Sequence, residues 1–234
     1  MALYERFVTK PRDEFYTLED LQKNYRVVVG DNFNYGYDVL DVLGTEKPEE
    51  LAMLWISNEG EERRFTFGDL KRLSDKAANF FHSQGVRKGD MVLLVLKRGY
   101  QFWYAMMALH KIGAVAIPAT HLLMAKDYVY RCNMAEVKMV VLTGDDEVTE
   151  RFMEAAPECP SVKVKAVTKG KDVGEGWVDF DAGVEAASEV WERPTGDQAT
   201  RSEDMMLAFF TSGTTGYPKL VWHSFTYPLG HILT

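Results

Sequence analysis

The chain has 234 residues, of which 46% are hydrophobic and 26% are charged, and its formal net charge is −8. This length and composition are those of a globular protein with a sizeable core, and they exclude the disordered and fibrous classes. The negative charge argues against nucleic acid or an anionic membrane as a partner, because both bind to basic surfaces. An anionic ligand would therefore need a local site.

The cysteines and the first residues bear on the compartment. Cys132 and Cys159 form no CxxC pair or Cys/His cluster, which indicates free thiols in a reducing compartment rather than a zinc site or a disulfide scaffold. The N-terminus carries Glu5 and Arg6 and lacks the apolar core of a secretory signal, and no stretch reaches the ~18 apolar residues that span a bilayer. We therefore expect a cytoplasmic protein without a membrane span.

Residues 1–50 are predicted to form a lead-in that docks on the main body. A short helix is expected near Leu18–Asn24. Between Tyr35 and Leu43 the apolar residues recur at helical spacing, which predicts an amphipathic helix that Gly44 can end.

Residues 51–203 are predicted to form an α/β subdomain. It opens with two short strands, Leu51–Ser57 and Arg64–Phe67, which a polar turn joins into a hairpin. Thr66–Asp69 has the form of a capping box, so a helix is expected to begin there and to end by Gly85.

Strands and helices then alternate along the chain. Apolar runs predict strands at Met91–Leu96, Ala114–Ile117, Val137–Leu142 and Val162–Val167. Periodicity predicts helices at Tyr100–Ile112, Ala125–Ala135 and Asp146–Ala156, and a further helix is expected near Asp181–Val190. This alternation predicts the fold class: an α/β protein with a doubly wound, mostly parallel sheet and flanking helices.

Several polar side chains in this stretch are assigned no function. Lys97 and Arg98 are expected at a solvated strand end. His110 and His121 have no partner at the spacing of metal ligands. We therefore predict no metal-binding residue in this chain.

Residues 204–234 are predicted to hold a phosphate-binding loop. An apolar strand, Met205–Phe210, is followed by six small residues and then by Pro218 and Lys219. The six residues are Thr211, Ser212, Gly213, Thr214, Thr215 and Gly216. Glycines let main-chain N–H groups approach an anion, hydroxyls add donors, and the Lys219 ammonium adds a point charge. A Gly/Thr-rich surface turn is the alternative, but a turn rarely needs so many small residues followed by Pro and Lys.

The spacing excludes a Walker A loop. Counted from Gly213, the pattern G-x-x-x-x-G-K-[ST] puts Pro218 at its second glycine and Leu220 at its magnesium-binding hydroxyl. Residues 220–222 also predict another strand, where a Walker A loop would lead into a helix.

Three segments carry a resemblance to one superfamily. Thr211–Lys219 reads Thr-Ser-Gly-Thr-Thr-Gly-x-Pro-Lys, which resembles the signature loop of the adenylate-forming, or AMP-binding, enzymes: acyl-CoA synthetases, luciferases and peptide-synthetase adenylation domains. The segment FNYGYDVLD, residues 33–41, and His223, four positions after Lys219, are similar to acetyl- and medium-chain acyl-CoA synthetases. The resemblance implies the N-terminal part of the large domain of such an enzyme.

The resemblance implies a ligase reaction in two steps. A carboxylate attacks the α-phosphate of ATP, which releases pyrophosphate and leaves an acyl-adenylate, and the thiol of coenzyme A then takes the acyl group. Thr211–Gly216 would hold the β- and γ-phosphates, Lys219 would serve the leaving pyrophosphate, and Mg²⁺ would bridge phosphate oxygens. Lys219 and His223 are thus the implied catalytic residues, and a small-molecule carboxylate, ATP and CoA are the implied substrates.

The length of the chain leaves two interpretations open. Members of the superfamily are much longer, and their adenine-binding, ribose-binding and catalytic-lysine segments come later. The chain is then either the N-terminal portion of an acyl-CoA synthetase or a catalytically inactive fragment, at most a weak nucleotide-binding or interaction module. Residues 204–234 would hold the truncated start of the next subdomain, with a helix from Ser224 to Thr234. We expect Gly213–Lys219 and this helix to be mobile, and an exposed apolar face to favour self-association.

Overall fold

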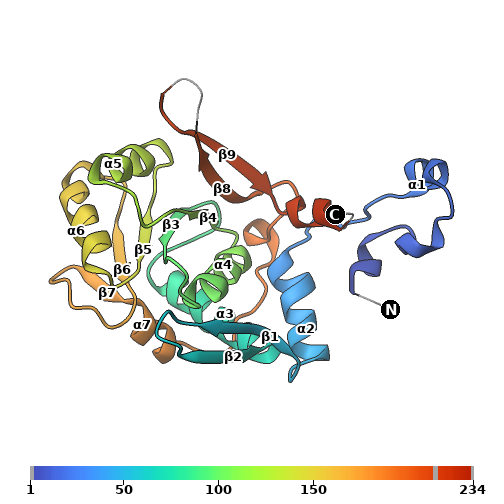
Figure 1. Cartoon of the computed structure of the whole chain (residues 1–234), viewed down its shortest axis with the longest axis horizontal. Helices are drawn as coiled ribbons and strands as arrows, with labels where there is room; N and C mark the ends of the chain where they lie inside the picture. The colour runs from blue at the N-terminus through green and yellow to red at the C-terminus, as the bar shows by residue number, and fades with distance from the viewer. Residues whose placement is uncertain (1–2, 213–215, 233–234) are drawn as a thin grey trace.

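A seven-stranded sheet forms the centre of the molecule (Figure 1). The computed structural model describes residues 3–212 and 216–232. The strands are β3 (Met91–Val95), β4 (Val115–Pro118), β5 (Met139–Leu142), β6 (Val164–Val167), β7 (Trp177–Asp179), β8 (Met205–Thr211) and β9 (Lys219–Ser224). Their order is β7-β6-β5-β3-β4-β8-β9, and neighbouring strands are parallel except β8 and β9. The predicted α/β fold with a mostly parallel sheet is confirmed.

Helices cover both faces of this sheet. On one face lie α3 (Phe67–Ser83), α4 (Gln101–Ile112) and α7 (Phe180–Ala186), and on the other lie α5 (Ala125–Met134) and α6 (Asp146–Ala155). Side chains of β3 alternate between the two layers, with Val92 and Leu94 in the first and Leu93 and Val95 in the second. Strands that are buried on both faces are apolar, as β3, β4 and β5 are, whereas β6 includes Lys165; all four lie within two residues of the predicted bounds.

The expected hairpin lies outside the main sheet. It consists of β1 (Leu51–Ile56) and β2 (Glu62–Thr66), which pair antiparallel. The predicted capping box follows it: the Asp69 N–H donates to Thr66 Oγ1 at 3.1 Å, and the Thr66 N–H donates to Asp69 Oδ2 at 3.1 Å. These bonds satisfy main-chain donors of the first turn, so α3 begins at Phe67.

Two predicted helices are shorter than expected. α7 ends at Ala186, because the Asn79 side chain holds the carbonyl oxygens of Ser188 and Val190, both at 2.9 Å, in a non-helical path. The helix predicted from Ser224 to Thr234 is replaced, in its described part, by a 3₁₀ turn, η6 (Tyr227–His231). Residues 233–234 lie outside the described residues. The other short elements are α1 (Leu18–Asn24, as predicted), η1 (Leu3–Phe7), η2 (Arg12–Glu14), η4 (Ala156–Glu158) and η5 (Gly196–Gln198).

The prediction that Gly44 ends the second helix of the lead-in is wrong. The chain is helical from η3 (Gly36–Asp41), a π-helical turn, through α2 (Val42–Glu46), and Gly44 lies inside α2. A Cβ at this position would lie 2.7 Å from the Lys71 side chain and 3.0 Å from the Phe67 carbonyl oxygen. The glycine therefore permits α2 to approach α3 closely, and that role cannot be distinguished from a helix stop in a linear sequence.

A buried ammonium group joins the lead-in to the core. Lys111 in the last turn of α4 is fully buried, and its Nζ donates to Asp75 Oδ1 of α3 at 2.5 Å. It also forms an ion pair with Asp41 of η3, with 2.6 Å between Nζ and Oδ1. Burial raises the pKa of Asp41, and the charge of Lys111 opposes that rise. Lys71 completes the group, 2.7 Å from the second Asp75 oxygen.

The segment that precedes η3 also holds the approach to β8. The buried Asn34 amide donates to the His110 carbonyl oxygen at 2.7 Å and to Thr200 Oγ1 at 3.1 Å. Ser202 Oγ accepts from the Phe33 N–H at 3.0 Å and donates to the Gly30 carbonyl oxygen. Residues 30–34 thus fix residues 200–202, which lead directly into β8.

Both cysteines are free thiols in the layer between the sheet and α5–α6. Cys132 and Cys159 are buried, and burial raises the pKa of each thiol.

Within residues 3–212 and 216–232, none of the helices is both long enough and apolar enough to cross a bilayer.

A histidine is buried in α4 without a polar partner. His110 is 4% exposed and packs edge-on against Phe225, with ring centroids 6.0 Å apart. In the described part of the chain, neither ring nitrogen has a hydrogen-bond partner. Burial lowers the pKa of His110 to about 3, so the folded protein holds it neutral.

We expect Lys111→Met to lower the free energy of unfolding by about 3–5 kcal/mol, because it leaves buried carboxylates without their counter-ion. Lys47→Met is the control, since it removes an exposed pair with Glu50 and should cost about 1 kcal/mol or less. Urea unfolding at neutral pH measures both. Equal losses would contradict an anchoring role for Lys111.

We expect His110→Leu to gain stability over the wild type as pH falls below 6.5. Between that pH and about 3, the unfolded chain binds one more proton at His110 than the folded chain does. The wild type then loses about 1.4 kcal/mol of unfolding free energy per pH unit through this group, and the variant does not. Urea unfolding from pH 7.5 to 4.5 tests this, with His121→Leu as the control. Parallel curves for His110→Leu and the wild type would be the opposing result.

Candidate functional site

The phosphate-loop hairpin, which we define as β8, residues 212–218 and β9, stands at one edge of the molecule (Figure 1). β8 and β9 pair from Met205 and Ser224 to Thr211 and Lys219. The parallel sheet joins this hairpin at one register pair only, Ala116 with Leu207. The far half of the hairpin therefore has no strand of the parallel sheet beside it.

The described residues of the predicted cradle are open to solvent. Thr211 and Ser212 are exposed, and the Thr211 hydroxyl donates to the Lys219 carbonyl oxygen at 3.4 Å. Gly216 has φ of +113°, a value that side chains rarely allow, and it is also exposed. Lys219 is exposed, and in the described ranges no carboxylate forms an ion pair with it. Its ammonium group is therefore available to an anion.

The central residues of the cradle, Gly213, Thr214 and Thr215, lie outside the described residues. Their predicted contact with phosphates stays a prediction. The expected mobility of Gly213–Lys219 and of the chain end also falls in part on such residues. Gly216–Lys219 is described, and it contacts α5.

Lys219 and His223 share one face of the hairpin. Directly opposite residues of an antiparallel pair lie on the same face, and here Lys219 faces Thr211 and His223 faces Leu207. The two side chains are four residues apart, which is about 13 Å along a strand at about 3.3 Å per residue. The structure thus brings Lys219 beside Thr211 and leaves His223 deeper on the same face.

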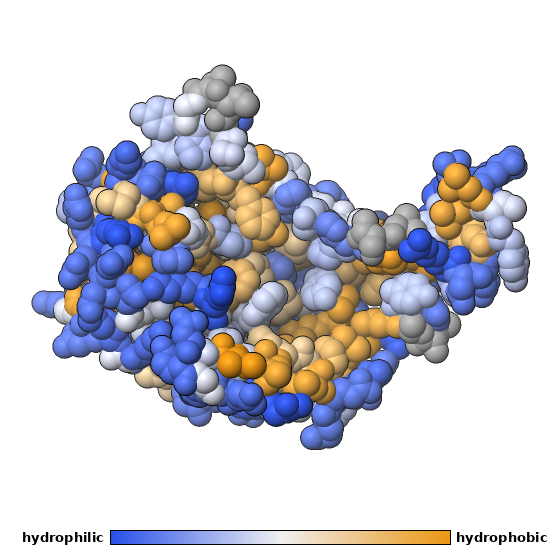
Figure 2. All heavy atoms as spheres, in the orientation of Figure 1, coloured by the Kyte–Doolittle hydropathy of each residue, from blue (hydrophilic) through white to orange (hydrophobic). Residues whose placement is uncertain are grey.

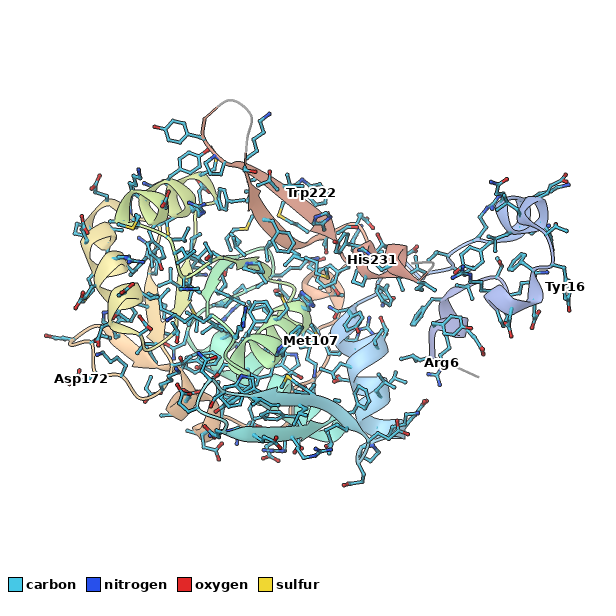
Figure 3. The ribbon with its side chains drawn as sticks, in the orientation of Figure 1. Arg6, Tyr16, Met107, Asp172, Trp222 and His231 are labelled. Carbon is cyan, nitrogen blue, oxygen red and sulfur yellow. The ribbon has the colours of Figure 1, made fainter. Side chains whose placement is uncertain are left out.

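His223 belongs to a row of aromatic rings. Its ring lies 4.0 Å from Tyr227 and 6.1 Å from Phe209, centroid to centroid, and Tyr227 lies 4.9 Å from His231. Figure 3 labels Trp222 on β9 and His231 in η6, the two elements to which His223 and Tyr227 belong. Packing against rings is a sufficient structural reason for a histidine here, and it leaves the predicted catalytic role a prediction.

Sequence reasoning missed the contacts between the loop and α5. Tyr130 of α5 donates its hydroxyl to the Pro218 carbonyl oxygen at 2.9 Å and stacks on Tyr217, with centroids 5.0 Å apart. Tyr217 occupies the wildcard position of the nine-residue motif, so the motif gave no signal for it. A hollow of about 730 Å³ lies beside this contact, lined by Lys126, Asp127, Val129, Tyr130, Asn133, Met134, Gly216, Tyr217 and Pro218.

The described residues of the motif offer hydroxyl groups and the Lys219 ammonium group as polar side-chain groups. Nowhere in residues 3–212 and 216–232 do three or more His, Cys, Asp or Glu side chains gather as metal ligands.

Below the hairpin, Figure 2 shows apolar residues gathered around a hollow face that extends toward β1. Leu54 and Ile56 of β1 and Trp222 of β9 are among the exposed apolar side chains.

Comparisons with known proteins identify the family. Residues 41–232 match the family model described as AMP-binding enzyme. The acyl-coenzyme A synthetase ACSM4, mitochondrial, of Mus musculus is 34% identical over 199 residues, which cover 82% of this chain and 33% of that protein. The acyl-coenzyme A synthetase ACSM3, mitochondrial, of Pongo abelii is 30% identical over 95% of this chain and 38% of its own length. The chain thus spans about a third of the length of the curated relatives it matches.

A solved structure shows the same fold. It is the crystal structure of the anthranilate CoA ligase AuaEII in complex with anthranoyl-AMP, which matches with a TM-score of 0.72 at 21% identity. The match covers 86% of this chain and 36% of that chain.

The predicted cytoplasmic location is wrong. The relatives are named as mitochondrial proteins. The prediction relied on the lack of a secretory signal, and that observation argues only against secretion. It does not distinguish the cytoplasm from another reducing compartment.

The predicted membership of the AMP-binding superfamily is confirmed by the match over residues 41–232. The chain belongs to the AMP-binding enzyme family.

Proposed function

We propose that this chain supplies the ATP-phosphate-binding, N-terminal part of an acyl-CoA synthetase that acts on acetate to medium-chain acids. ATP and a carboxylate would give an acyl-adenylate and pyrophosphate, and CoA would then give acyl-CoA and AMP. The observation that carries this proposal is the nine-residue motif Thr211–Lys219, presented on an exposed hairpin in a chain of this family. The names of the relatives, acyl-coenzyme A synthetases, support the reaction class.

The proposed chemistry of the loop is electrostatic. The Lys219 ammonium would neutralise charge on the leaving pyrophosphate, and the hydroxyls of Thr211 and Ser212 would donate to phosphate oxygens. Gly216 leaves its main-chain N–H free of a side chain that would block an anion. Since both reactants of the first step are anions and the chain has a net charge of −8, these local donors must supply the attraction.

The residues at the loop fit a magnesium ion that arrives with ATP. Mg²⁺ prefers oxygen ligands and usually takes substrate phosphates and water together with few protein groups. Thr211 and Ser212 offer exposed hydroxyl oxygens of this kind. When bound, the ion would supply charge neutralisation at the phosphates.

His223 is proposed to lie near the nucleotide or the acyl group. It shares its face of the hairpin with Lys219, which supports a ligand that extends along this face. The tilted contact with Tyr227 at 4.0 Å would fix the plane of its ring.

A second function remains proposed for the 234 residues taken alone: nucleotide binding, or interaction, without catalysis. The chain spans about a third of the relatives, and the resemblance assigns the adenine and ribose contacts to later segments. The exposed apolar side chains below the hairpin support self-association as such an interaction.

The names of the relatives support a mitochondrial location.

We expect Lys219→Ala to weaken the binding of Mg·ATP by at least about tenfold, because a charge-assisted contact to phosphate is lost. Isothermal titration calorimetry with the purified chain measures the affinity. Lys47→Ala removes an exposed lysine far from the hairpin in sequence and should bind as the wild type does. Equal affinities of Lys219→Ala and Lys47→Ala would rule out the proposed phosphate site.

We expect no ATP–pyrophosphate exchange from these 234 residues with acetate, butyrate or longer acids, because the loop provides only part of the nucleotide contacts. Exchange of label between pyrophosphate and ATP is the measurement. Exchange that disappears in Lys219→Ala would overturn the binding-only function and establish adenylation by this chain.

A further inference from the structure

The helix α5 contacts both stems of the phosphate-loop hairpin. On the β9 side, the Tyr130 hydroxyl donates to the Pro218 carbonyl oxygen at 2.9 Å, and the Tyr130 ring stacks on Tyr217 at 5.0 Å with an interplanar angle of 24°. On the β8 side, the same ring meets Phe210 edge-on at 6.2 Å, and the Arg131 guanidinium lies 5.3 Å above the Phe210 ring. One side chain, Tyr130, therefore touches the strand that enters the loop and the segment that leaves it.

α5 is a firm support for these contacts. Tyr128 and Cys132, on either side of Tyr130 in the helix, are fully buried in the layer beneath it. The Asn133 amide ties the end of the helix to the Glu158 carbonyl oxygen at 2.9 Å. The helix is thus fixed to the core.

The hairpin needs such a support. β4 pairs with β8 only at Ala116 and Leu207, and the β8–β9 ladder ends at Thr211 and Lys219. Between the end of the ladder and the loop, the described contacts that hold Tyr217 and Pro218 are those to Tyr130. Lys219 follows Pro218 directly and pairs with Thr211 at the last position of the ladder, so its position depends both on the ladder and on the contacts to Tyr130.

We propose that Tyr130 is a positioning residue of the phosphate site. Its hydroxyl and its ring hold the Gly216–Pro218 end of the loop on α5, and they thereby set the place of the Lys219 ammonium. Tyr130 acts through the loop and touches no phosphate. Only the consequence for ligand affinity rests on the proposed function, because the anchoring itself is a property of the free chain.

The contacts of Tyr130 with Pro218 and with Tyr217 can be separated by substitution. Tyr130→Phe removes the hydroxyl and retains the ring, whereas Tyr217→Ala removes the stack and retains the hydroxyl bond. The double variant should then approach Tyr130→Ala, which in addition removes the edge-on contact with Phe210. Tyr16→Ala is the control, since Tyr16 is 91% exposed and lies at the far end of the lead-in (Figure 3).

Amide hydrogen exchange of the free chain tests the anchoring. We expect Tyr130→Ala to raise exchange at the β9 amides, residues 219–224, by about tenfold, the factor of one lost hydrogen bond with its ring contact. Tyr130→Phe and Tyr217→Ala should each give a smaller rise, and the amides of β5 should not change in any variant. Unchanged exchange at β9, or an equal rise at β5, would overturn the proposal, whatever the chain binds.

Affinity for Mg·ATP provides the second measurement. We expect Tyr130→Ala to bind more weakly than the wild type and Tyr130→Phe to recover most of the loss, a rescue that a general loss of stability would not give. If β9 exchange rises while the affinity of Tyr130→Ala equals that of the wild type, the positioning role is excluded. If the wild type itself does not bind Mg·ATP, the proposed function fails, and the exchange result still decides the anchoring by Tyr130.

Discussion

The charge of Lys111, removed from water, determines how the parts of this protein are joined. An ammonium group in the core requires counter-ions beside it, and they come from α3 and from η3. That requirement fixes the lead-in against α4. Asn34 and its neighbours then hold residues 200–202, from which β8 begins. The start of the phosphate-loop hairpin is thereby linked to a charge buried beside the core.

The same arrangement explains why an acidic protein can present a site for anions. The carboxylates near Lys111 are compensated inside the protein, while Lys219 is exposed on the hairpin and has no ion-pair partner within the described residues. A net charge of −8 does not prevent local attraction, because the field near a single exposed ammonium group is set by its closest neighbours.

Local signals in the sequence predicted most of the fold. The double burial of β3 required a continuous apolar run, and the capping box at Thr66 and Asp69 marked the start of α3. The motif around Thr211 pointed to the family because its spacing alone distinguishes it from a Walker A loop. Contacts between distant residues were not predictable in this way. Gly44 looked like a helix stop because its close neighbour, Lys71, is remote in sequence. Tyr130 and Tyr217 come into contact only when the fold brings α5 and the hairpin together, and neither segment's local sequence pattern predicts that contact.

The contacts between α5 and the hairpin join two segments that lie far apart in the sequence. The Tyr130 hydroxyl and the Pro218 carbonyl oxygen to which it donates belong to residues 88 positions apart in the sequence. Within the described residues, the end of the loop is thus supported by a helix that lies far upstream of it in the sequence. A substitution in α5 would therefore alter the loop without changing any residue of the nine-residue motif.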